Sequence, residues 1–144
     1  MTSIISRKPF YSSIATIVFF PLVVFVINGI LVSLFGMETL EEKKIDNILH
    51  GFGGVSVCLS SAGVLWHLVR REIITLQDKY VFHFLVFGFL CFVVIGWEVL
   101  EYIVHIYIFP ENRHLVGYSD TVIDMVLGLV GGLFSMFFVR RPVG

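Results

Sequence analysis

Seven acidic and histidine side chains fall at three places in the sequence where their spacing could build one ion-binding site. They form two pairs with a spacing of four residues and one trio with spacings of three and four: Asp46 and His50; Asp120 and Asp124; Glu98, Glu101 and His105. At about 100° per residue, each set occupies one face of a helix. Carboxylates and imidazoles on converging helix faces can share protons or hold a divalent cation.

The donor types predict a divalent metal ion, because mixed carboxylate and imidazole ligands suit Zn, Mn, Fe or Mg. We expect His50, Glu98 and Asp124 to bind the metal, with Glu101 as general base and Glu98 also a candidate catalytic group. The remaining members of the set are expected as outer ligands or orienting groups: Asp46, Asp120 and His105. Because the Glu-x-x-His pattern of soluble di-metal bundles is absent, the spacing does not specify the number of metal ions.

Structural roles compete with this interpretation at three of the positions. Asp46 and Asp120 stand where helices are expected to begin, and an Asp there commonly caps free backbone N–H groups. His105 stands near Tyr102 and Tyr107 and could belong to an interfacial aromatic belt. The other four lie within apolar segments, where a charged side chain facing lipid costs about 2.5–3.5 kcal/mol, so we expect them to point inward.

The elements that must position these residues are membrane spans. Of the 144 residues, 57% are hydrophobic and only 15% are charged, and the mean hydropathy is +0.92. This composition predicts an all-α, polytopic membrane protein: one domain, 1–144, containing a bundle of about four transmembrane helices with short loops. The expected spans are about 11–36, 47–69, 80–108 and 121–139.

The first span is expected to be retained, not cleaved as a signal peptide, and to be kinked at Pro21, whose ring removes a backbone donor.

Small residues predict how the spans pack. The second and fourth spans are rich in them, and small residues let helix backbones approach closely in lipid. In the fourth span, steps of 4 and 7 from Asp124 reach Gly128 and Gly131. We therefore expect these two spans at the centre of the bundle, with Asp124 facing inward.

Positively charged residues predict the orientation of the chain in the membrane. Four spans place both termini and the connection between spans two and three on the same side, which carries seven Lys and Arg residues: Arg7, Lys8, Arg70, Arg71, Lys79, Arg140 and Arg141. The other side carries three: Lys43, Lys44 and Arg113. Because cytoplasmic loops carry the excess of positive charge, we expect a multi-pass protein of the cell (inner or plasma) membrane with both termini in the cytoplasm.

The order of these motifs resembles the VanZ-like membrane proteins and the related YjdF-like group. The matching features are Asp46-x-x-x-His50 followed by Gly51, the span end with Glu98 and Glu101, and Asp120-x-x-x-Asp124 before the Gly-rich helix. The resemblance covers about 46–132 and leaves span one outside. It implies a small helical membrane protein with a link to the cell envelope, and the doubled Glu98 and Glu101 favour the YjdF-like branch, for which it implies no activity.

Three functional interpretations follow, and the sequence does not decide whether the protein is an enzyme. The first is a metal-dependent hydrolase or transferase acting on a lipid or lipid-linked envelope substrate near the outer leaflet. The second is a cation- or proton-binding transport protein, and the third is a non-catalytic membrane subunit whose buried acids tie helices together. The lipid bilayer is the expected surrounding, an oligomer is compatible with the sequence, and the scattered Lys and Arg argue against nucleic acid as a partner.

Overall fold

The computed structural model describes residues 9–36, 39, 44–76, 78–108 and 117–140, which are helical apart from short connections. A short 3₁₀ turn, η1 (Phe10–Ser12), and a π-helical turn, η2 (Ala15–Phe19), precede four α-helices. The four helices are α1 (Phe20–Phe35), α3 (Ile45–Arg70), α4 (Lys79–Tyr107) and α5 (Tyr118–Met136). The described part of the chain contains no strand, so the all-α prediction is confirmed.

Four helical segments are long and apolar enough to cross a membrane, as the sequence predicts. They are Ala15–Phe35, Ile45–Arg70, Lys79–Val104 and Tyr118–Met136. The fourth begins three residues before the expected position 121, so Asp120 lies within its first turn instead of ahead of it. Which face of the membrane each end meets stays a prediction.

The first span is irregular at the expected proline, but the irregularity precedes Pro21. The π-helical turn η2 ends at Phe19, and Pro21 then occupies the first turn of α1. A proline has no N–H to donate to the carbonyl four residues earlier and its ring crowds that carbonyl, and a wider turn before it relieves both problems. The proline therefore starts the regular helix and does not kink its interior.

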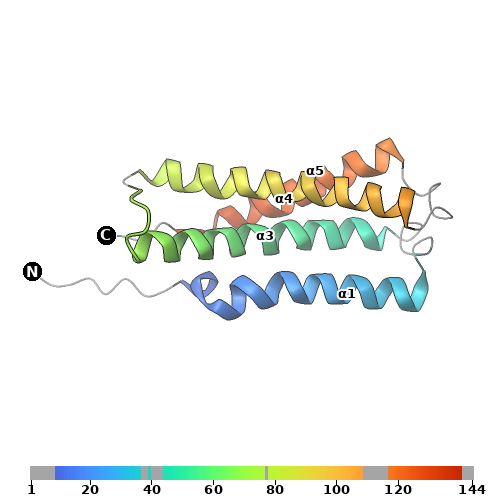
Figure 1. Ribbon diagram of the computed structural model, residues 1–144, viewed down its shortest axis with the longest axis horizontal. Coiled ribbons are helices and arrows are strands. Elements are labelled where there is room, and N and C mark those ends of the chain that lie inside the picture. Colours follow the sequence, from blue (N-terminus) through green and yellow to red (C-terminus); the bar gives the residue numbers. More distant parts are fainter. Residues whose placement is uncertain (1–8, 37–38, 40–43, 77, 109–116, 141–144) are drawn as a thin grey trace, which may run out of the picture.

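Helices α3 and α5 form the centre of the bundle because their glycines place the two backbones in contact. A Cβ atom added at Gly54 would meet the backbone of Gly128, and one added at Gly131 would meet the backbone of Gly51. Helix α3 also packs against α1 and α4, and Figure 1 shows it between them. The prediction that the second and fourth spans are central is therefore confirmed.

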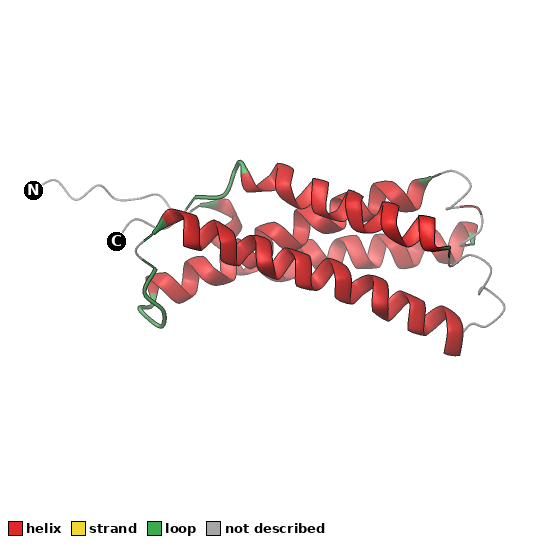
Figure 2. Ribbon diagram, turned by 90° about the horizontal axis from the view of Figure 1, so that it is seen from above, coloured by secondary structure: helices red, strands yellow, loops and turns green. Residues whose placement is uncertain are grey.

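The helices run antiparallel along the chain, as Figures 1 and 2 show. The end of the bundle that contains the end of α3 and the start of α4 also contains η1 and the end of α5. There, the hydroxyl of the buried Tyr11 accepts a hydrogen bond from the backbone N–H of Arg140 at 2.8 Å and donates one to its carbonyl. Burial raises the pKa of the Tyr11 phenol, while its contacts with Arg140 oppose that rise. These bonds join the two ends of the described chain. The cluster of acidic residues around His50 lies toward the opposite end of the bundle.

The close approach of α3 and α5 predicts different outcomes for two adjacent glycines. Gly54→Ala places a methyl group against the Gly128 backbone, so we expect a loss of about 1–3 kcal/mol in the free energy of unfolding in detergent. Gly53→Ala is the matched control, because a Cβ there meets nothing within 4 Å. The assignment of the α3–α5 interface is wrong if thermal or denaturant unfolding shows both variants equally stable.

Candidate metal centre

The imidazole of His50 lies at the centre of three carboxylates contributed by the three helices α3, α4 and α5. Its Nε2 atom is 3.3 Å from Asp46 Oδ2, one turn earlier in α3, and 4.0 Å from Asp124 Oδ2 of α5. Its Nδ1 atom is 3.3 Å from Glu98 Oε1 of α4. The two ring nitrogens thus face different carboxylates.

The donor atoms divide into two groups that share His50. Asp46, His50 and Asp124 form one group and His50, Glu98 and Glu101 form the other, and within each group the donor atoms lie within 4.8 Å of one another. The spacing of four on α3 and of three on α4 puts each pair on one helix face, and the glycine contacts between α3 and α5 bring Asp124 beside His50. Because a metal–ligand bond is only about 2 Å long, either group could close around one ion with small side-chain movements.

Two of the carboxylates are buried and incompletely paired. Asp124 is 4% exposed and Glu98 is 7% exposed. Asp124 Oδ1 and Glu98 Oε1 are buried oxygens without a hydrogen-bond partner, since the 3.3 Å approach of Glu98 to His50 is within ion-pair distance but is not aligned as a hydrogen bond. A buried carboxylate oxygen without a donor is costly and is typical of a site that takes up protons or a cation.

The remaining candidates predicted from the sequence, which are Glu101, Asp120 and His105, do not take part in the three His50 contacts described above. Glu101 is half-buried and belongs to the group that also contains His50 and Glu98. Asp120 is half-buried in the first turn of α5 and belongs to neither group. The backbone of His105 lies in α4, but its side chain is outside the described part of the structure. Whether any of the candidates binds a metal or reacts stays a prediction.

Helix capping does not account for the two aspartates at helix beginnings. The residue that precedes α3 is Lys44 and the one that precedes α5 is Gly117, and neither helix start shows a side-chain capping hydrogen bond. Asp46 instead points to His50. The carboxylate of Asp46 therefore belongs with the cluster.

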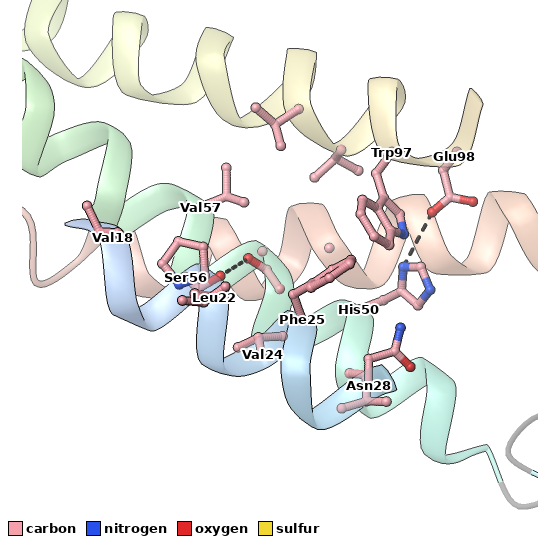
Figure 3. A pocket seen from close by; sticks show the side chains of 17 residues that line it. Val18, Leu22, Val24, Phe25, Asn28, His50, Ser56, Val57, Trp97 and Glu98 are labelled. Atoms are coloured by element: carbon pink, nitrogen blue, oxygen red, sulfur yellow. Dashed lines mark hydrogen bonds and ion pairs between the residues drawn. The ribbon is translucent and has the colours of Figure 1, made fainter. Parts of the chain in front are cut away.

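An apolar cavity of about 480 Å³ begins beside the cluster and runs between α1, α3 and α4. His50, Glu98 and Trp97 lie at one end in Figure 3, and Asn28 of α1 stands at the same end. The Asn28 Oδ1 atom is buried and has no hydrogen-bond partner. Span one lies outside the site that the sequence predicts, although an Asn within a long apolar run is a signal that could have indicated it.

A protein-family model matches nearly the whole length of the chain. The model described as "Predicted membrane protein (DUF2238)" matches residues 3–142. No curated protein and no solved structure gives a significant match.

The crowding of carboxylates predicts that removing one charge stabilises the metal-free protein. In chelator at neutral pH, Glu98→Gln should raise the free energy of unfolding by about 1–3 kcal/mol, because it removes a buried, incompletely paired charge beside Asp124. Chemical denaturation in detergent measures the change. Glu72→Gln, an exposed change at the opposite end of the bundle, is the control. A Glu98→Gln variant less stable than the parent in chelator would show that the charge is already compensated within the protein.

Proposed function

The chain belongs to the DUF2238 family of predicted membrane proteins, and on that premise we propose that it is a membrane-embedded metal hydrolase. In this proposal Asp46, His50 and Asp124 hold one divalent cation, which activates water against an ester bond. The proposal also includes the narrower assignment of the chain to the VanZ-like or YjdF-like proteins and the link to the cell envelope that this assignment implies.

The observation that carries the proposal is the pair of buried carboxylate oxygens without donors, Asp124 Oδ1 and Glu98 Oε1. Two further carboxylates, those of Asp46 and Glu101, stand near the same imidazole. A single imidazolium would leave the cluster negative, and negative charge is costly within a bundle that is surrounded by acyl chains. A divalent cation supplies two positive charges where the imidazolium supplies one, and so compensates more of the negative charge of the cluster.

The two sides of the His50 ring favour different roles. Nε2 faces Asp46 and Asp124 at 3.3 and 4.0 Å, and these three donors form the ligand set. Nδ1 faces Glu98 Oε1 at 3.3 Å without an aligned hydrogen bond, and a small rotation of either side chain would let Glu98 accept the Nδ1–H and fix the ring orientation, as carboxylates beside metal-binding histidines commonly do. We therefore assign Glu98 to positioning His50 in place of direct ligation.

Three protein ligands leave a coordination position for water, which is the arrangement typical of catalytic and not of structural zinc sites. A divalent cation held by Asp46, His50 and Asp124 would make a water molecule there more acidic and so a better nucleophile at neutral pH. Glu101, whose carboxylate lies within 4.8 Å of a ring nitrogen of His50, is the candidate base that receives the water proton, directly or through a bridging water. The water oxygen bonds to the ester carbon or phosphorus, the ester bond to the leaving oxygen breaks, and that oxygen takes up the proton.

Two other accounts of the cluster make different predictions. A transport site would need ionisable groups along a path across the bundle, but the described His67 and His83 at the opposite end bond to backbone carbonyls: Ser12 for His67, and Lys79 and Val139 for His83. A purely structural cluster would share protons and would not need a cation. Metal content separates these accounts.

Metal analysis of the detergent-purified protein tests the proposal. We expect about one equivalent of Zn, Mn or Fe in the parent, and its loss in Asp124→Asn and in His50→Gln, with full content in the Glu72→Gln control. At 100 times the dissociation constant, the metal should stabilise the parent by about 2.7 kcal/mol and the two variants by little.

Two results would contradict the proposal. Equal metal content in the parent and in Asp124→Asn would place the metal elsewhere, and absence of metal in every preparation after loading would favour the proton-sharing account. With metal bound, ester hydrolysis in lipid vesicles should disappear in Asp124→Asn, and a metal-dependent cation flux without hydrolysis would point to transport.

A further inference from the structure

The cavity beside His50 is lined by residues of all four helices. One side of it is formed by η2 and α1, which contribute Val18, Leu22, Phe25 and Asn28. Every helix around the cavity contains a membrane-spanning segment. Its surroundings are therefore lipid, and a membrane lipid is the molecule with direct access to it.

The cavity has an apolar end and a polar end, as an amphiphile has. Val18, Leu22 and Val57 lie at one end in Figure 3, and Asn28, His50 and Glu98 lie at the other. Most binding pockets combine a largely apolar lining with a few polar groups that fix the orientation of the ligand. The lining thus indicates a chain in the apolar end and a polar head beside His50.

The unpartnered atoms at the polar end indicate the chemistry of the head. Asn28 Oδ1 and Glu98 Oε1 are both hydrogen-bond acceptors, and both are buried without a donor. A head that carries hydroxyl groups supplies donors to both. A phosphate head would bring negative charge beside Glu98 and Asp124, so an uncharged, hydroxyl-bearing head fits better.

The volume limits the number of chains. At about 480 Å³, the cavity is roughly three times the ~150 Å³ cavity that holds one benzene molecule. That space suits one acyl chain and is too small for two together with a head.

The packing of α1 provides an entrance from the bilayer. Among the described residues, the α1 backbone packs closely against α3 and the η2 turn but makes no comparably extensive contact with α4 or α5. Across the gap, the rings of Phe25 and Trp97 meet edge to face, with centroids 6.0 Å apart. No residue of α1 is buried, so the side of the cavity between α1 and α4 is the one through which a lipid chain from the bilayer would enter.

We infer that the cavity binds a single-chain lipid with an uncharged hydroxyl-bearing head, of the monoacylglycerol class, with its chain along α1 and its ester bond beside His50. The chemistry at the head rests on the proposed hydrolase, whereas the binding of the chain does not. Hydrolysis of this substrate joins the water oxygen to the acyl carbon, breaks the ester C–O bond and gives a fatty acid and glycerol.

Quenching of Trp97 fluorescence by a brominated chain tests the inference. In a Trp66→Phe background, Trp97 is the sole tryptophan. A monoacylglycerol with a dibrominated chain is added in detergent micelles, with chelator present, and unbrominated monoacylglycerol serves as competitor. We expect saturable quenching that the competitor reverses, and no saturable quenching by a dibrominated diacylphosphatidylglycerol.

Two glycines provide a matched pair of variants. Gly53 lines the cavity and a Cβ there meets nothing within 4 Å, so Gly53→Leu fills the cavity without a clash at Cβ. Gly96 is exposed on α4 and its Cβ also meets nothing, so Gly96→Leu adds the same side chain outside the cavity. We expect Gly53→Leu to raise the half-quenching concentration about tenfold or more, and Gly96→Leu to change it by less than about twofold.

The inference is overturned if the parent shows no saturable quenching, if both leucine variants behave alike, or if the diacyl probe quenches as well as the monoacyl probe. Metal content measured on the same samples keeps the two proposals apart. Saturable quenching without metal binding would refute the hydrolase and leave the lipid site, whereas metal binding without saturable quenching would refute the lipid site alone.

Discussion

The burial of several carboxylates around one imidazole is the constraint on which the site depends. Asp124 and Glu98 are more than nine-tenths buried, at the end of a bundle whose outer faces are apolar. In such a setting a carboxylate must gain a proton, a hydrogen-bond donor or a cation, because its charge is no longer compensated by water. The two ring nitrogens of His50 face carboxylates on both sides, but Asp124 and Glu98 each keep an oxygen without a hydrogen-bond donor. An additional positive species is the simplest way to complete the cluster.

The glycine contacts between α3 and α5 determine the position of Asp124 in the same site. Asp124 can approach His50 only because α3 and α5 are close at Gly54 with Gly128 and at Gly51 with Gly131. Between helices in lipid, the hydrophobic effect gives little help, so close van der Waals packing of small residues must supply the attraction. Side chains of ordinary size at these positions would move the helices apart and separate Asp124 from His50. The packing of the two helices and the proposed chemistry therefore depend on the same glycines.

The sequence predicts the parts of this arrangement that follow from periodicity and composition. Four apolar stretches predict the spans, and the small residues predict that the second and fourth spans pack together at the centre. The positions of His50, Glu98 and Asp124 on inward-facing helix surfaces predict that these three side chains meet. Periodicity places a residue on a helix face but does not fix its rotamer or its height against another helix, so the division of the carboxylates between Nε2 and Nδ1 of His50 could not be predicted. Asn28 could not be assigned to the site from the sequence, because α1 lacks an acidic stripe. The π-helical turn before Pro21 could not be predicted either, because a proline alone does not specify how its missing hydrogen bond is accommodated.

X-ray absorption spectroscopy of the zinc-loaded protein in detergent tests the central claim most directly. The account predicts one imidazole nitrogen and carboxylate oxygens at about 2.0–2.2 Å, with the imidazole signal lost in His50→Gln. A zinc shell of oxygen atoms alone in the parent, or an imidazole signal that persists in His50→Gln, would contradict it.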